Sequence, residues 1–121
     1  MSISYSFADG FLKYKVSGDY VFQEVYPVIN QSLKDNRFKY GMNFLIDVTQ
    51  SEAKRTTEEA YEFVDFLSLK YEFKGSKIAV VTPRPVPYGL ARMTSVYLDE
   101  FDICLEVFRD LAEAEQWLKN K

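Results

Sequence analysis

Alternating hydrophobic and polar positions at the start of the chain predict a β-hairpin. A period of two is typical of a strand with one buried face, and the pattern runs through residues 2–7 and again through residues 12–16. Asp9-Gly10 lies between the two runs and is a favoured two-residue turn. The apolar positions of the alternation are Ile3, Tyr5, Phe7, Leu12, Tyr14 and Val16.

Apolar residues at helical spacing predict four helices farther along the chain. Asp19, Thr56 and Asp110 are suitable N-caps for three of them, because their side-chain oxygens can accept bonds from the first N–H groups of a helix. The remaining helix is expected over residues 91–101. Pro27 should kink the first helix or mark its start.

The second helix carries two apolar stripes, of which one should face the sheet. The other stripe needs cover from a neighbouring helix or from another subunit. The expected inner stripe is Ala60, Phe63, Val64, Leu67 and Tyr71, and the second stripe is Phe66, Leu69 and Phe73.

Three nearly continuous apolar runs, over residues 42–48, 77–82 and 103–108, predict strands covered on both faces, as in a parallel sheet. Cys104 in the last run is expected to be a buried, inert thiol. The resulting order is ββαβαβαβα. The fold class is therefore α/β, with a mixed, mostly parallel sheet in a single domain over residues 1–121.

Composition narrows the classes of function. The 121 residues contain no histidine, so Ser-His-Asp hydrolases and zinc enzymes are not expected, and no metal or cofactor is predicted. The formal net charge of -3 gives no general attraction to nucleic acid, and the basic segment 34–39 is interpreted as a solvated connection. Aromatic residues make up 17% of the chain, which favours a homodimer or another protein interface.

The beginning of the chain has neither a basic region nor a continuous apolar region of the kind found in signal peptides. No apolar run approaches the roughly 20 residues needed to cross a bilayer. We therefore expect a cytoplasmic protein without a membrane span.

The segment over residues 83–93, PRPVPYGLARM, is the first place to look for a site, because loops at the carboxyl ends of parallel strands carry the sites of α/β folds. Tyr88, Met93 and the prolines could wall a small apolar cavity there, toward which Arg92 could open. Asp47 ends an apolar strand near the same edge. It either bonds to the N–H groups around Thr49 and Gln50 or serves a functional role.

Arg92 needs an anion, since a cation in the first turns of a helix gains nothing from the helix dipole. A structural ion pair with Asp99 or Asp47 is favoured over a ligand carboxylate or phosphate. If Asp47 and Arg92 face one pocket, they could act as a base and an anion clamp.

Four segments of the sequence, RTTEEA, IAVVTP, YGLARM and EVFRDLAEAEQWL, together resemble the SpoIIAA-like group of small bacterial proteins. That group shares its fold with STAS domains and, more distantly, with CRAL-TRIO lipid-binding domains. The resemblance implies a β-α fold without catalytic machinery.

STAS relatives are phosphorylated on a serine at the start of the helix after the third strand. The positional substitutes in this chain are Ser51, Thr56 and Thr57, but the Asp-Ser-Ser-Gly-like motif is absent and Thr56 is better explained as a helix cap.

Three functions follow from these observations. The leading one is a non-enzymatic regulatory or protein-interaction domain that forms a homodimer. The alternative is a binding domain for a small amphipathic or lipid-like ligand, held near Tyr88, Met93 and the second stripe of the long helix. The third is an enzyme that uses Asp47 and Arg92.

Overall fold

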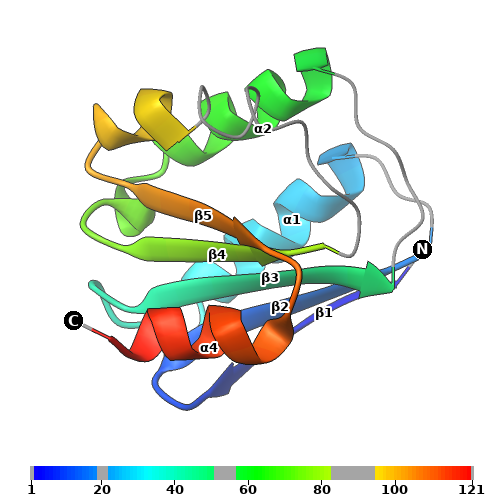
Figure 1. Ribbon diagram of the computed structural model, residues 1–121. Coiled ribbons are helices and arrows are strands. Elements are labelled where there is room, and N and C mark those ends of the chain that lie inside the picture. The colour runs from blue at the N-terminus through cyan, green and yellow to red at the C-terminus, as the bar shows by residue number, and fades with distance from the viewer. Residues whose placement is uncertain (1, 19–21, 51–56, 83–94, 121) are drawn as a thin grey trace.

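The structure is a computed structural model that describes residues 2–18, 22–50, 57–82 and 95–120, and it shows one five-stranded sheet in the order β1-β2-β3-β4-β5 (Figure 1). Residues 95–99 are also helical. The other elements are β1 (Ser2–Ala8), β2 (Phe11–Ser17), α1 (Phe22–Leu33), β3 (Asn43–Gln50), α2 (Thr57–Ser68), the 3-10 helix η1 (Tyr71–Phe73), β4 (Lys77–Val81), β5 (Cys104–Phe108) and α4 (Leu111–Lys119).

The predicted hairpin is confirmed. Strands β1 and β2 pair antiparallel without a register shift, from Ser2 opposite Ser17 to Ala8 opposite Phe11. Asp9 and Gly10 have φ angles of 56° and 85°, as a type I′ turn requires at both central positions. The three remaining strand pairs are parallel, so the predicted mixed, mostly parallel α/β fold is also confirmed.

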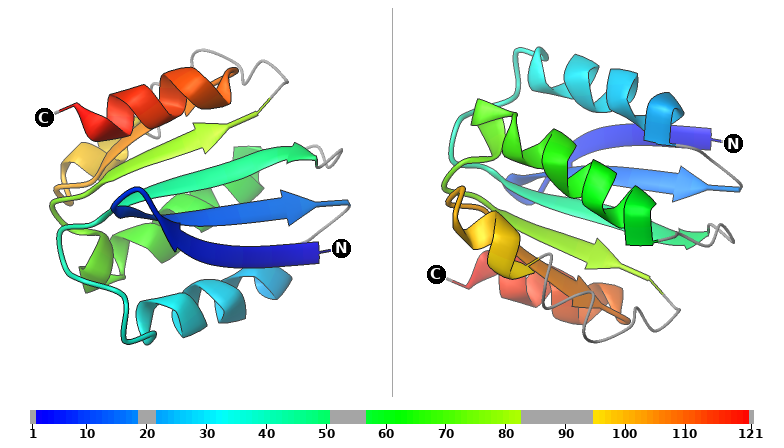
Figure 2. Two further views of the ribbon diagram at one scale, coloured as in Figure 1. Left: turned by 90° about the horizontal axis from the view of Figure 1, so that it is seen from below. Right: turned by 90° about the horizontal axis from the view of Figure 1, so that it is seen from above.

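Helices cover the two faces of the sheet unequally. Helices α1 and α2 lie on one face together with residues 95–99, whereas α4 lies on the other (Figure 2). This arrangement follows from the strand order, because successive right-handed crossovers that proceed in one direction place their helices on the same face.

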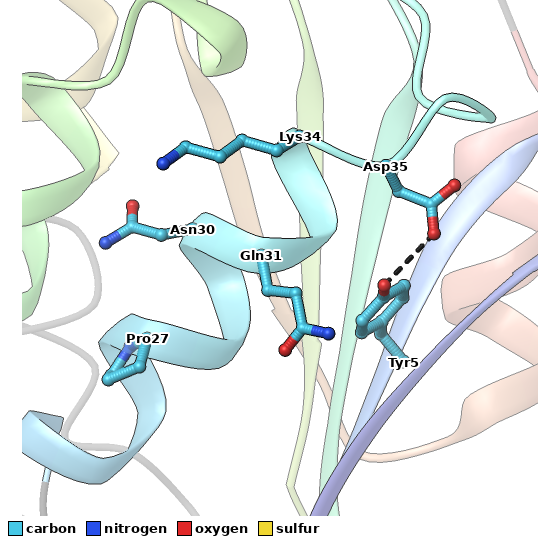
Figure 3. A pocket seen from close by; sticks show the side chains of 6 residues that line it. All are labelled: Tyr5, Pro27, Asn30, Gln31, Lys34 and Asp35. Atoms are coloured by element: carbon cyan, nitrogen blue, oxygen red, sulfur yellow. Dashed lines mark hydrogen bonds between the residues drawn. The ribbon is translucent and has the colours of Figure 1, made fainter.

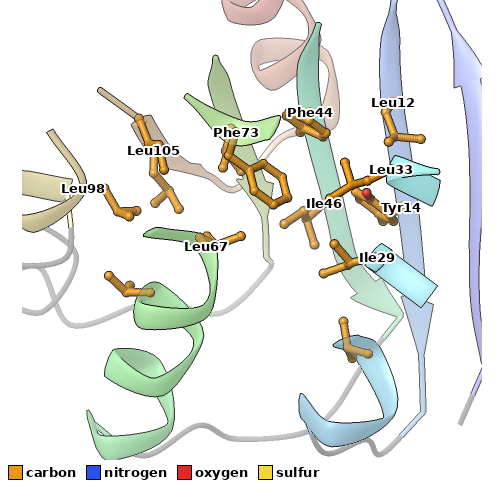
Figure 4. Packing of buried hydrophobic residues seen from close by; sticks show 14 residues of the cluster. Leu12, Tyr14, Ile29, Leu33, Phe44, Ile46, Leu67, Phe73, Leu98 and Leu105 are labelled. Atoms are coloured by element: carbon orange, nitrogen blue, oxygen red, sulfur yellow. The ribbon is translucent and has the colours of Figure 1, made fainter. Parts of the chain in front are cut away.

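The larger core lies between the sheet and the helices α1 and α2 (Figure 4). Its polar member is Tyr14, whose hydroxyl lies 2.5 Å from Ser32 Oγ. Ser32 Oγ donates to the carbonyl of Ile29, so Tyr14 is the donor in the pair. Burial raises the pKa of Tyr14, and its hydroxyl stays protonated. The fully buried members include Leu12, Phe44, Leu67, Phe73, Ile78 and Leu98.

The smaller core lies beneath α4 and consists of Phe11, Leu45, Ala79, Val81, Ala114 and Leu118. Helix α4 is placed by its predicted N-cap, because the Asp110 side chain accepts a bond of 3.0 Å from Ala112 N. A salt bridge of 3.1 Å between Lys13 and Glu115 fixes the helix to β2.

Two expectations for the second helix need correction. Helix α2 ends at Ser68, so Tyr71 follows on η1 and is 67% exposed rather than facing the sheet. In the predicted second stripe, Leu69 is 83% exposed and Phe73 is fully buried. Phe66 receives the expected cover from a neighbouring helix, because it stacks on Tyr26 of α1 with ring centroids 4.1 Å apart.

The expectation for Cys104 was wrong. Cys104 is exposed, because it lies on the face of β5 opposite Leu105 and the edge strand has less contact with α4 than β4 has. Leu111 at the start of α4 is 37% exposed. Pro27 lies inside α1, so it does not mark the start of this helix, and the alternative expectation of a kink stays a prediction.

Candidate functional site

The carboxyl ends of the parallel strands meet at one edge of the sheet, where the sequence predicted a site. Gly18 N, just after β2, donates over 3.1 Å to Gln50 O at the end of β3, and Thr82 N, just after β4, donates over 2.9 Å to Phe108 O at the end of β5. Of the predicted site residues at this edge, the structure describes the side chain of Asp47.

Asp47 bonds within its own strand end. Its Oδ1 accepts a bond of 2.9 Å from Thr49 N and one of 2.6 Å from Thr49 Oγ1. The interpretation of Asp47 as a cap for the adjacent backbone is therefore confirmed, and this pairing accounts for a half-buried carboxylate in an apolar strand.

The other predicted site residues, Tyr88, Arg92, Met93, Ser51 and Thr56, lie outside the described residues. Thr57 is the first residue of α2, so this helix begins directly after the expected cap. The pairing of Asp47 with Arg92 stays a prediction, and phosphorylation at Ser51, Thr56 or Thr57 is likewise untested.

The opposite, amino-terminal edge of the sheet carries a series of aromatic rings that leads from the core to the surface. The rings of Phe73 and Phe44 lie 4.5 Å apart in the core, and Phe44 lies 6.1 Å from Phe38. Tyr40 lies 5.6 Å from Phe38 and 5.6 Å from Tyr71. We call the outer three residues, Phe38, Tyr40 and Tyr71, the aromatic edge.

Solvent exposure of the aromatic edge is high for residues of this size. Tyr40 is 70% exposed and Tyr71 is 67% exposed, although their rings contact each other. Tyr40 lies in the connection before β3, and Tyr71 lies in the connection before the neighbouring strand β4, so the parallel pairing of these strands brings the two rings together. Two large aromatic rings side by side in solvent are characteristic of binding surfaces.

One lysine contacts the aromatic edge, and two more adjoin it in sequence. Lys74 Nζ lies 5.9 Å from the centre of the Tyr71 ring, and Lys39 and Lys70 are the sequence neighbours of Tyr40 and Tyr71. None of these three lysines forms a salt bridge within the part of the chain that the structure describes. The surface is therefore both apolar and cationic.

A second cluster joins β1 to the connection after α1. Asp35 accepts bonds of 3.0 Å from Tyr5 OH, 2.9 Å from Arg37 Nη2 and 3.0 Å from Arg37 Nε. The Arg37 guanidinium lies 4.8 Å from the centre of the Phe7 ring. The hydrogen bonds from Arg37 hold the pKa of Asp35 well below its usual range, and the bond to Asp35 raises the pKa of Tyr5.

An open pocket of about 510 Å³ lies beside this cluster, between Tyr5 and the exposed side of α1 (Figure 3). Its lining combines polar and apolar surface in similar amounts and comes from Tyr5, Pro27, Asn30, Gln31, Lys34 and Asp35. It differs from the predicted apolar cavity in both position and chemistry.

Comparison with known proteins supports the fold. No family model matches the sequence, and no curated protein matches it. An uncharacterised protein of the DUF3478 family from Shewanella loihica PV-4, whose solved structure is described as SpoIIAA-like, is similar over 97% of this chain and 92% of that chain. The TM-score is 0.60 at 19% sequence identity. The chain has a SpoIIAA-like fold.

This SpoIIAA-like fold confirms the resemblance derived from the sequence motifs. At 19% identity the likeness concerns the fold alone, and the similar protein is itself uncharacterised. Within the described residues, no helix is long and apolar enough to cross a membrane.

Proposed function

We propose that the chain is a non-enzymatic SpoIIAA-like protein-interaction domain that binds its partner through the aromatic edge. The observation that carries this proposal is the contact between Tyr40 and Tyr71, which are both about two-thirds exposed. Burying such rings against a partner removes large apolar surfaces from water, and tyrosine is enriched among the residues that dominate binding energy.

The rings contact one another, and through Phe38 the core, without a partner. Phe38 is half-buried, and it connects Tyr40 to the fully buried Phe44. A side chain that is already held in place loses less conformational entropy on binding than a mobile one, which favours affinity.

The charges near the aromatic edge indicate the character of the partner. The segments over residues 36–42 and 69–76 contain Lys39, Lys70 and Lys74 and the acidic residue Glu72, whereas the charge of Arg37 is paired with Asp35. A protein surface that combines acidic and apolar residues would complement them. The same lysines would repel one another across a two-fold axis, so this surface is poorly suited to self-association.

A homodimer remains a prediction from the aromatic content of the sequence, and light scattering over a range of protein concentrations tests it directly. If dimerisation depends on the aromatic edge, Tyr71→Ser should abolish it. Dimerisation that persists in Tyr71→Ser would show that the dimer forms through a surface other than the proposed partner surface.

The proposal assigns no catalytic role to Asp47. Support comes from its bonds to Thr49, which engage Oδ1 twice and give the carboxylate a local structural purpose. Asp47→Asn should lower stability with little effect on partner binding.

The alternative function is binding of an amphipathic or lipid-like ligand. Part of the cavity wall expected for that ligand is engaged in other contacts. Phe73 packs against Phe44 in the core, and Phe66 stacks on Tyr26, so neither is left to line a cavity. Native mass spectrometry of the purified chain tests this alternative, and a co-purifying apolar ligand would favour it over the proposal.

Site-specific photo-crosslinking tests the proposed function. A photoreactive phenylalanine at position 71 should join the chain to one partner in cells of the source organism, whereas the same group at the exposed position 111 should not. Lys70→Glu combined with Lys74→Glu should remove the cross-link. Equal cross-linking at positions 71 and 111, or no dependence on the two lysines, would contradict the proposal.

A further inference from the structure

Strand β1 is an edge strand among the described residues, and its own sequence and register lack the features that usually protect an edge against pairing. Its seven residues include no charged side chain and no proline, and its register with β2 has no bulge. Natural edge strands are commonly shortened, charged, bulged or covered, because an open edge exposes unpaired backbone groups. The other edge strand, β5, has five residues and carries Glu106.

The hairpin register identifies which backbone groups of β1 face outward. Ala8 and Phe11 flank the two-residue turn and therefore form a hydrogen-bonded pair. Hydrogen-bonded and non-hydrogen-bonded pairs alternate along the ladder, so Ser6 and Ser4 also form hydrogen-bonded pairs with their partners on β2. The N–H and C=O groups of Ile3, Tyr5 and Phe7 consequently point away from β2, toward the open edge.

A second copy of the chain fits this edge poorly. Antiparallel pairing of two β1 strands requires a two-fold axis perpendicular to the sheet, which keeps both copies of α1 on one face. Both views of Figure 2 show α1 lying beyond β1 at this margin of the molecule. The two helices would therefore compete for the same space, whereas a single extended segment brings no such helix.

The chemistry beside the edge favours an acidic segment. Asp35 in the pocket lining is already neutralised by Arg37 and bonded to Tyr5 (Figure 3). Lys34 in the same lining forms no salt bridge within the described residues. The side-chain amides of Asn30 and Gln31 add donors that have no partner among the described contacts.

We propose that the outer edge of β1 binds an extended, acidic segment of another protein by strand addition, with its carboxylates attracted by Lys34. Main-chain bonds to Ile3, Tyr5 and Phe7 would supply affinity, and the side chains that face α1 would supply selectivity. This site goes beyond the aromatic edge, because it is a different surface and uses a different mode of recognition.

Titration of the full, isotope-labelled chain with the acetylated and amidated peptide TETETET tests this proposal by NMR. The amide signals of Ile3, Tyr5 and Phe7 should shift more than those of Ser4 and Ser6, and their hydrogen exchange should slow. The peptide TKTKTKT should not produce these changes.

A charge reversal and its matched control sharpen the test. Lys34→Glu should weaken binding of TETETET by roughly fivefold, the effect expected for an exposed charge contact. Lys119→Glu, an equal change at the distant end of α4, should leave binding unaltered. Lys34→Gln should give an intermediate result.

Several results would overturn the proposal. Equal binding of the acidic and basic peptides, or no binding of TETETET, would exclude an acidic strand at this edge. Shifts centred on Tyr40 and Tyr71 would place the peptide at the aromatic edge instead. Slow exchange of the Ile3, Tyr5 and Phe7 amides in a peptide-free dimer would show that a second copy occupies β1.

Discussion

The inner and outer ends of one aromatic series differ in what they contribute to the molecule. Phe44 and Phe73 are fully buried between the sheet and its helices, whereas Tyr40 and Tyr71, linked to them through Phe38, are mainly in solvent. The inner rings stabilise the fold by removing apolar surface from water. The outer rings gain little for the fold, which is why we assign them to recognition.

The largest effect should come from removing an inner ring. Phe44→Ala leaves a cavity at a site with no exposed surface, so the free energy of unfolding should fall by about 3–5 kcal/mol. Urea denaturation measures the change. A loss below about 1 kcal/mol would mean that the series is not anchored in a packed core.

Removal of the hydroxyl group should likewise cost more stability at a buried tyrosine than at an exposed one. Tyr14→Phe removes the bond to Ser32 inside the core and should cost about 1 kcal/mol. Tyr71→Phe is the matched control and should leave the urea midpoint unchanged, because this side chain is mainly in solvent. Equal losses in the two variants would remove the distinction between inner and outer residues.

Much of the fold could be predicted from the sequence, because local patterns carry it. The serine alternation and Asp9-Gly10 specify the hairpin, and Asp110 specifies the start of α4. Cys104 was assigned to the wrong environment because an apolar run cannot reveal that its strand lies at an edge of the sheet.

The aromatic edge was harder to predict. Helical periodicity continues through Tyr71, although α2 ends at Ser68 and Leu69 N already contacts both Asp65 O and Phe66 O. The proximity of Tyr40 to Tyr71 depends on β3 and β4 being neighbours, which no local pattern encodes. The basic and aromatic residues of segment 34–39 were the available signal, and they were interpreted as a solvated connection.

A smaller, pH-dependent effect is expected where β1 meets the connection after α1. Because Arg37 lowers the pKa of Asp35, the folded state favours the ionised carboxylate. The resulting stability is present above the unfolded pKa of about 3.9 and is lost as the pH falls below it. Arg37 is well exposed and lies close to Asp35 in sequence, so solvent screening keeps the effect small.

Urea midpoints measured between pH 6 and pH 3 should therefore fall less steeply in Asp35→Asn than in the natural chain. Arg37→Gln should reduce the slope as well, because it removes the donor responsible for the lowered pKa. An unchanged slope in both variants would show that this pair does not couple folding to pH.

The variant that combines Tyr40→Ser and Tyr71→Ser tests the central claim most directly, with its unfolding free energy and its partner binding measured together. Stability should stay within about 0.5 kcal/mol of the natural chain, since both residues are mainly exposed. Cross-linking from a photoreactive group at the neighbouring position 39 should be lost. A large loss of stability, or cross-linking that persists in the folded variant, would contradict the assignment of the aromatic edge to recognition.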